Sequence, residues 1–236
     1  MTTTPTHPTA AAVADRTLAD LVGERPARAI VREGLGLDYC CHGERPLRDA
    51  ADAAGIDPDR VVDALARSDA QASDARDDGA ESLAPVELAD HIVATHHRYL
   101  REQLPVLQGL AAKVRDVHGS RHPELRHVAD VVEELAAELL PHLDVEERDL
   151  FPAVPRVIAG EQPADVLPTV AQLRDEHVVA GNLLAVLRGA SAGYEVPADG
   201  CASYRLLYEG LTALEADTFR HIHLENNVLF PALARS

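Results

Sequence analysis

Two segments of the sequence carry the same pattern of residues able to hold a metal ion. The segment HLDVEERDLFPAV begins at His142, and HIHLENNVLFPAL begins at His221. In both segments a Glu follows the His by four residues, as Glu146 and Glu225. On a helix, residues four apart lie on the same face, one turn from each other. Two such pairs facing each other inside a helical bundle are typical of a dinuclear metal site.

The repeat extends beyond this motif, because two further His keep nearly the same spacing. His97 precedes His177 by 80 residues, and His142 precedes His221 by 79 residues. The second half of this region is therefore a copy of the first: a helix with one His, then a helix with a His and a Glu. Such a duplication predicts ligands arranged around a pseudo-two-fold axis. The candidate metal ligands are His97, His142, Glu146, His177, His221 and Glu225.

These residue types favour two metal ions held close together. Carboxylates can bridge the ions and offset their mutual repulsion, while imidazoles occupy the outer positions. Nitrogen and oxygen ligation without thiolate suits iron or manganese and leaves zinc open. A single His on an apolar helix stripe is more often a hydrogen-bonded core residue. Four His and two Glu buried without a metal would, however, be costly unless all of them were paired.

The elements that must position these residues are four long amphipathic segments, at about 86–118, 123–158, 164–190 and 201–233. Each carries one of the four His on its apolar stripe, and short connections make neighbouring helices antiparallel. The predicted fold is all-α, with an antiparallel four-helix bundle after a small helical domain. Pro105 and Pro141 fall inside the helical pattern and are expected to kink their helices. A distorted turn is therefore expected beside His142.

The N-terminal part of the chain is expected to form a separate helical domain. Residues 1–16 are interpreted as a disordered tail, 17–68 as a small helical domain and 69–84 as a polar, acidic linker before the bundle at 85–236. The adjacent Cys40 and Cys41 lie between two short predicted helices. Vicinal Cys can bind a metal through thiolates, form a strained disulfide or exchange with other thiols. Cys201, before the last helix, is interpreted as structural or incidental.

Composition limits the classes of function. The 236 residues carry a net charge of -17, which disfavours nucleic acid and anionic membranes as partners. Aromatic residues make up only 3% of the chain, which favours helices over sheets. No apolar run is long enough to span a bilayer, and the first residues lack the features of a signal peptide. A cytoplasmic protein without a disulfide framework is expected.

Two resemblances to known proteins follow from these motifs. The segment 85–233 resembles the hemerythrin-like His-His-Glu bundle. The whole chain resembles the di-iron iron–sulfur cluster repair proteins, through LGLDYCCHG, DHIVATHHRYLREQLP, HLDVEERDLFP, RDEHVVAG and HIHLENNVLFP. The resemblance implies the same six ligands, and it selects His97 over the adjacent His96. It also implies two non-haem iron ions per chain, with an oxo or hydroxo bridge.

The chain departs from the oxygen-carrying hemerythrins at two positions. Those proteins carry another His one turn after the third-helix His, where this chain has Gly181. They also have an Asp five residues after the fourth-helix His, where this chain has Asn226. The loss of these groups leaves iron less saturated by protein. Exchange, reaction or release of iron is therefore favoured over reversible oxygen carriage.

Other residues receive roles mainly through the resemblance. Cys40 and Cys41 match the Cys pair of the repair family, with His42 where the family usually has Gly, and they are expected to hand iron on. Glu138, Glu176 and His96 lie near the ligand stripes, where each is expected to orient an imidazole or, for the two Glu, to supply an alternative carboxylate. Phe151 and Phe230 are interpreted as core residues, and no catalytic residue is assigned.

The function implied by the resemblance is repair of iron–sulfur clusters damaged by nitric oxide or oxidants, by donation of exchangeable iron. Damaged iron–sulfur proteins are the expected transient partners, with nitric oxide or oxygen species as small-molecule partners. A homodimer is left open. Two alternatives remain: reduction of nitric oxide to nitrous oxide at the same site, and a sensor or store for nitric oxide, oxygen or iron. A conventional enzyme is not expected.

Overall fold

The fold is given by a computed structural model that describes residues 10–24, 28, 35, 37, 43–71 and 79–235. The chain divides into two compact units, Met1–Gly79 and Ala80–Ser236, and each is described by itself. The prediction of an all-α protein is confirmed, since the described residues contain helices and a single isolated β-bridge between Thr17 and Pro46. The boundaries of the tail, domain and linker stay a prediction.

The first unit is a small cluster of short helices around an aliphatic core. Its core side chains, which include Leu18, Leu21, Leu47, Val61 and Leu65, are almost fully buried. Cys40, Cys41 and His42 lie outside the described residues. The helices of this unit are α1 (Ala10–Ala14), α2 (Leu18–Glu24), α4 (Leu47–Ala53) and α5 (Pro58–Gln71).

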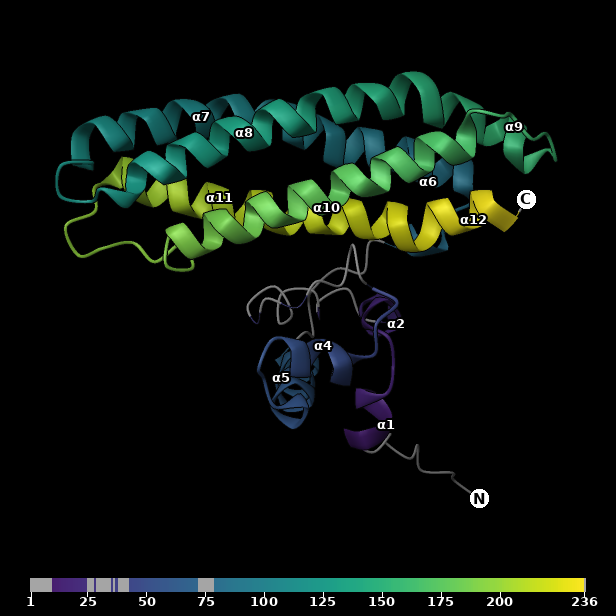
Figure 1. The fold of residues 1–236 in the computed structure, drawn as a ribbon, viewed down its shortest axis with the longest axis horizontal. Coiled ribbons are helices and arrows are strands. Elements are labelled where there is room, and N and C mark those ends of the chain that lie inside the picture. The colour runs from purple at the N-terminus through teal and green to yellow at the C-terminus, as the bar shows by residue number, and fades with distance from the viewer. Residues whose placement is uncertain are drawn as a thin grey trace. The chain divides into compact units, whose positions relative to one another are not determined.

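The second unit is a four-helix bundle (Figure 1). Helix α7 packs against both α8 and α11, and α10 packs against α8. Short connections between consecutive helices make them antiparallel. The predicted bundle is therefore confirmed. Its helical elements are η1 (Ala80–Ser82), α6 (Pro85–Ile92), η2 (Val93–His97), α7 (Arg98–His118), α8 (Glu124–Val145), η3 (Glu146–Leu150), η4 (Phe151–Ala153), α9 (Val154–Ile158), α10 (Val166–Ala190), α11 (Ala202–Leu224), η5 (Glu225–Leu229) and α12 (Phe230–Arg235).

Three of the four long segments contain a π-helical turn beside a predicted ligand. These turns are η2, which ends at His97, and η3 and η5, which begin at Glu146 and Glu225. Single π turns inside α-helices often occur at functional sites. Each one widens the helix by one residue, so Glu146 and the following Leu150 and Phe151 all lie in the interior.

The distorted turn expected at Pro141 is not found there. Helix α7 continues through Pro105 and helix α8 continues through Pro141, both as α-helix. Both prolines are exposed, so water can reach the carbonyl groups that they leave without a partner. The π turn of η3 recurs in η5, where Arg220 occupies the position of Pro141. Pro141 is therefore not its cause.

The core continues on both sides of the predicted ligands. One cluster, at the end formed by α6, α9 and α12, includes Leu88, Ile92, Leu150, Leu224 and Phe230. Towards the other end the core consists mainly of Leu and Val from the four long helices. Within the described residues, no helix is both long and apolar enough to cross a membrane.

Candidate metal centre

The six predicted ligands converge in the interior of the bundle. All six are at most 4% exposed. Each comes from a different turn, and together they represent all four long helical segments. They form two groups of four, in each of which one nitrogen or oxygen atom per residue lies within 4.8 Å of the others. Glu146 and Glu225 belong to both groups, so the six residues form one connected centre.

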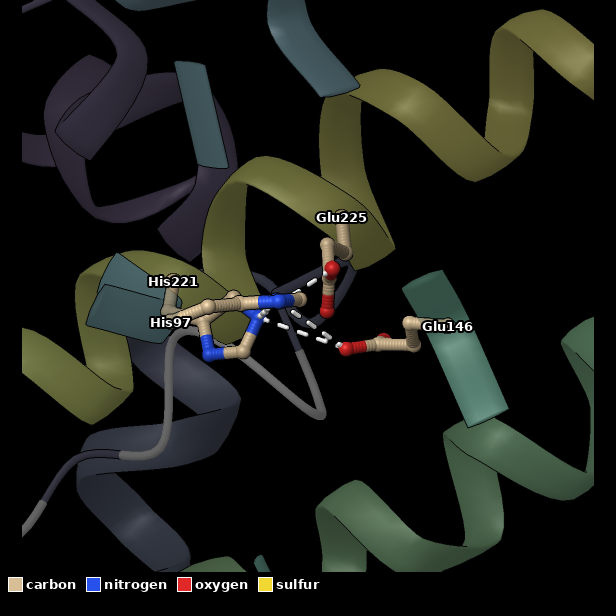
Figure 2. Close-up of side chains that lie close together, drawn as sticks. All are labelled: His97, Glu146, His221 and Glu225. Atoms are coloured by element: carbon tan, nitrogen blue, oxygen red, sulfur yellow. Dashed lines mark hydrogen bonds and ion pairs between the residues drawn. The ribbon is translucent and has the colours of Figure 1, made fainter. Parts of the chain in front are cut away.

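The first group contains His97 and His221 with the two carboxylates (Figure 2). His97 Nε2 lies 3.3 Å from Glu146 Oε2, and His221 Nε2 lies 3.1 Å from Glu225 Oε1. The two Nε2 atoms are 3.3 Å apart. Both imidazoles therefore direct the same ring nitrogen towards one point, which the carboxylates also face.

The second group repeats this arrangement with His142 and His177. His142 Nε2 lies 3.2 Å from Glu146 Oε1, and His177 Nε2 lies 3.1 Å from Glu225 Oε2. The two Nε2 atoms are 3.1 Å apart. Each carboxylate thus offers one oxygen to the first group and the other oxygen to the second. This is the arrangement that two bridging carboxylates require.

The polar atoms of the centre fit a bound cation. All four carboxylate oxygens of Glu146 and Glu225 are buried, and each lies 3.1–3.3 Å from an imidazole Nε2 without meeting the criteria for a hydrogen bond. Two buried carboxylates with no other partner among the described residues need compensating positive charge. The paired Nε2 atoms face each other at hydrogen-bond distance, yet each is needed as a lone-pair donor to a metal. Cations placed between these atoms would satisfy both requirements at once.

The electrostatics of the centre also favour positive charge. Burial alone would raise the pKa of Glu146, but the adjacent His142 outweighs burial and holds the pKa of this carboxyl well below its usual range. Burial alone would lower the pKa of His142, but Glu146 and then Glu225 raise it to about 9. The pKa of His221 is raised in the same way, chiefly by Glu225 against burial. Without metal, the two carboxylates therefore favour the protonated forms of His142 and His221.

Three of the four imidazoles are oriented by an acceptor at their other ring nitrogen, Nδ1. His97 Nδ1 lies 2.9 Å from Glu147 Oε1, and His142 Nδ1 lies 2.7 Å from Glu176 Oε2. His177 Nδ1 lies 3.0 Å from the side-chain oxygen of Asn226. An acceptor at Nδ1 places the proton there and directs the lone pair of Nε2 inwards.

Two of these acceptors were missed by the sequence reasoning. Glu176 was expected near the ligands, whereas Glu147 was not considered and Asn226 was noted only as a missing carboxylate. A signal was available, because Glu147 and Asn226 each directly follow one of the two shared Glu at equivalent positions of the repeat. On a π turn, the residue after a buried Glu can point back towards a neighbouring helix.

The other two residues expected near the ligands have different environments. Glu138 is exposed on α8, and the structure does not bring it to the centre. His96 is buried and stacks on His221, with ring centroids 5.8 Å apart and an angle of 7° between the planes. Its Nδ1 atom lies 2.9 Å from Asp217 Oδ1. Asp217 is the counterpart of Glu138, 79 residues later in the chain, and was also missed.

Phe151 and Phe230 contact the ligands directly. The Phe151 ring stacks on His97, with centroids 5.6 Å apart, and the Phe230 ring stacks on His177 at 5.9 Å. These rings form part of the core, as expected, and they also restrict the rotation of one imidazole in each group. The Phe of each Leu-Phe-Pro sequence therefore packs directly against the candidate site.

Cys201 lies away from this centre. It is exposed at the start of α11, and its Sγ atom lies 3.2 Å from Nε2 of the buried His118. The backbone N–H groups of Tyr204 and Ser203 at the start of α11 lower the pKa of its thiol. Nothing in this arrangement links Cys201 to the metal centre.

Comparison with protein families gives matches to both units. The family described as "Hemerythrin HHE cation binding domain" matches residues 88–233, which include all six predicted ligands. The family described as "Domain of Unknown function (DUF542)" matches residues 14–69. The first match covers more than half of the chain, and the resemblance to the hemerythrin-like bundle is confirmed.

Curated relatives match nearly the whole chain. The iron–sulfur cluster repair protein ScdA of Staphylococcus haemolyticus is 30% identical over 90% of this chain and 95% of its own length. The iron–sulfur cluster repair protein YtfE of an Enterobacter species is 33% identical over 92% of this chain and 96% of its own length. A probable iron–sulfur cluster repair protein of Haemophilus influenzae is also 33% identical, with the same coverage. With this identity over both units, the chain belongs to the iron–sulfur cluster repair protein family and carries its hemerythrin HHE cation-binding domain.

Proposed function

We propose that this protein repairs iron–sulfur clusters damaged by nitrosative or oxidative stress, by donating iron from an exchangeable non-haem di-iron centre. The observation that carries the proposal is the pair of buried groups that share two carboxylates, whose four oxygens each face an imidazole Nε2 at 3.1–3.3 Å. The names of the relatives, which describe iron–sulfur cluster repair proteins of nearly equal length, support the same function.

The types and number of donor atoms support binding of two iron ions per chain. Each group supplies two imidazole nitrogens and two carboxylate oxygens, a combination that suits iron and that thiolate-preferring metals do not favour. His97 and His221 would hold one ion, His142 and His177 the other, and Glu146 and Glu225 both. When bound, iron supplies the ion that a damaged cluster lacks, and an oxo or hydroxo bridge would make its retention depend on redox state.

The surrounding residues favour exchange over permanent retention. Helix α10 offers no ligand one turn after His177, because that position is Gly181. Asn226 uses its side-chain oxygen to orient His177 and so brings no further negative charge to the metals. Each ion would therefore have only four protein groups to hold it, which would leave it able to bind nitric oxide or to pass to an accepting ligand.

We also propose that Cys40 and Cys41 take part in the transfer of iron to a damaged protein. Thiolates bind iron and are the usual ligands of iron–sulfur clusters, so a thiol pair suits an intermediate carrier. The double variant Cys40→Ala/Cys41→Ala should keep its full iron content and transfer iron more slowly. Transfer at the wild-type rate would remove the Cys pair from the pathway.

The proposed function is tested by following labelled iron into a client. The protein is loaded with ⁵⁷Fe and mixed with an enzyme whose four-iron cluster has lost one iron. We expect the label to enter the client cluster in the Mössbauer spectrum, together with recovered client activity. Glu146→Gln should abolish both effects, whereas Glu138→Gln, an exposed change on the same segment, should leave them intact.

Two other outcomes would replace the proposal. Repeated formation of nitrous oxide from nitric oxide, with an electron donor and without iron loss, would make the centre that of a nitric oxide reductase. Reversible binding of nitric oxide, oxygen or iron without turnover and without client recovery would make the protein a sensor or a store. Stoichiometric loss of label to the client distinguishes donation from both.

A further inference from the structure

The two halves of the metal centre have equal inner ligands but unequal surroundings. The repeat relates His97 to His177, and His142 to His221, with Glu146 and Glu225 exchanged. The residues beside the outer nitrogens of these imidazoles occupy equivalent positions of the repeat but differ in type, with Glu147 opposite Asn226 and Glu176 opposite His96. Their pattern separates the half formed by His142 and His177 from the half formed by His97 and His221.

In the half formed by His142 and His177, both imidazoles have an acceptor at Nδ1. Glu176 accepts from His142 at 2.7 Å and also accepts from the neutral amide of Gln172 at 2.8 Å. Asn226 accepts from His177 at 3.0 Å. Both rings are therefore held with Nε2 directed inwards, and the carboxylate at Glu176 makes His142 a stronger electron donor.

In the other half, only His97 has such an acceptor among the described residues. Glu147 lies 2.9 Å from His97 Nδ1, but it also accepts a hydrogen bond of 3.0 Å from the cationic Arg101. Part of the negative charge of Glu147 is thereby offset. His221 Nδ1 is buried and has no hydrogen-bond partner within the described part of the chain.

The missing acceptor of His221 has a structural cause. The position equivalent to Glu176 is occupied by His96, whose ring lies parallel to that of His221, with an angle of 7° between the planes. The two rings do not hydrogen-bond to each other, since both His221 Nδ1 and His96 Nε2 lack a hydrogen-bond partner in the described part of the chain. The Nδ1 atom of His96 instead pairs with Asp217, at 2.9 Å. His221 is therefore packed by His96 without being oriented by it.

From this asymmetry we propose that the position formed by His97 and His221 holds its ion less tightly and releases it first. The inference rests on the proposed function, and it identifies His96 as a positioning residue of the centre. Outer partners of metal-bound His change metal affinity by about 10–100-fold, so the two positions should differ on that scale. One ion per chain would then be donated while the other keeps the bundle assembled.

The test uses the release of metal to a chromogenic chelator from full-length protein carrying two iron ions. Release should occur in two phases of one ion each. His96→Gln supplies an amide oxygen for His221 Nδ1 and an amide N–H for Asp217, and it should slow the fast phase about ten-fold. Glu176→Gln, the matched change at the equivalent position, should accelerate the slow phase and leave the fast phase unchanged.

Several results would overturn the inference. It fails if both ions leave at one rate, if His96→Gln leaves the fast phase unchanged, or if Glu176→Gln alters the fast phase. Asn226→Asp provides a second variant that adds charge beside His177 and should slow only the slow phase. These measurements need no client protein, so the proposed function can fail in the client assay while this inference stands, and the reverse also holds.

Discussion

The sharing of Glu146 between both groups predicts that one substitution removes both metal ions. Its Oε2 atom lies 3.3 Å from His97 Nε2, and its Oε1 atom lies 3.2 Å from His142 Nε2. Glu146→Gln keeps the size of the side chain but loses its charge and one acceptor oxygen. The remaining amide oxygen is neutral and can face only one group, so one group loses a donor and the other keeps a weaker one. A residue that served only one position would affect only one ion.

The expected size of the effect follows from the weakening of one carboxylate ligand at each of the two metal positions. Outer partners of metal ligands change affinity by up to about 100-fold, and a direct ligand should matter at least as much. A 100-fold loss equals about 2.8 kcal/mol at each position, or about 5–6 kcal/mol for both. At metal concentrations that saturate both proteins, this difference should lower the unfolding temperature by about 10–20 °C.

The assay combines iron content after desalting with thermal unfolding followed by circular dichroism. Glu138→Gln is the matched control, because it makes the same chemical change at an exposed position of α8. We expect about two irons per chain in the control and well under one in Glu146→Gln. Full iron content and a control-like unfolding temperature in Glu146→Gln would refute the shared site. Loss of one ion alone would confine Glu146 to a single position.

Three further predictions concern the stability of the bundle. The pKa of Glu81 is lowered because His223 and then Arg220 outweigh the effect of burial, so Glu81 stabilises the fold above its unfolded pKa of about 4.3 and this stabilisation is lost as pH falls through the folded-state pKa. In denaturant unfolding, Glu81→Gln should cost about 1 kcal/mol at pH 7 and progressively less as the pH is lowered. Gly210→Ala places a Cβ 2.6 Å from Leu107 Cδ2, the movable end of a side chain, so the gain in helix propensity should offset the crowding and the free energy of unfolding should change by less than about 1 kcal/mol without a change in iron content. Removal of iron by a chelator should lower the unfolding temperature, and added ferrous ion should restore it; an unchanged temperature would show that the bundle does not depend on its metal.

The positions of the predicted ligands were accessible to sequence reasoning because helix geometry is regular. A His and a Glu four residues apart must share a helix face, and a repeat of 79–80 residues must place two such faces in equivalent positions. The choice of His97 over His96 came from the resemblance to the repair family, with which the apolar stripe agrees, and both side chains are buried. The role of the six residues as metal ligands stays a prediction.

The π turns could not be predicted in the same way. A change from α to π geometry adds one residue to a turn and leaves no distinct mark in hydrophobic periodicity. Pro141 suggested an irregular turn because proline removes a hydrogen bond, but its exposed position lets α8 continue. The common feature of the η3 and η5 turns is the Phe-Pro pair that follows them. Pro152 and Pro231 cannot donate to the preceding turn, which favours a change of helix geometry there.

The outer partners were missed because they depend on contacts between helices. Glu147 reaches His97 from η3, and Asp217 reaches His96 from α11. Neither contact is set by spacing within one segment. Glu138 shows the converse, since its spacing from His142 matches that of Asp217 from His221, yet its side chain is exposed. A spacing rule therefore finds residues that share a helix face, and packing decides which of them reach a neighbour.

Residues that differ between the two copies of the repeat can make the two metal positions unequal, which the residues shared by both copies cannot do. If two copies of a helix pair supply identical ligands, any difference in affinity between the two metal positions must come from residues beyond the ligands. Here the differences are the acceptors Glu147 and Asn226, and the pair Glu176 and His96. Under the proposed function, a donor of iron needs one ion that leaves readily and a fold that survives its loss. Unequal orientation of His142 and His221 would meet both needs without any change of ligand.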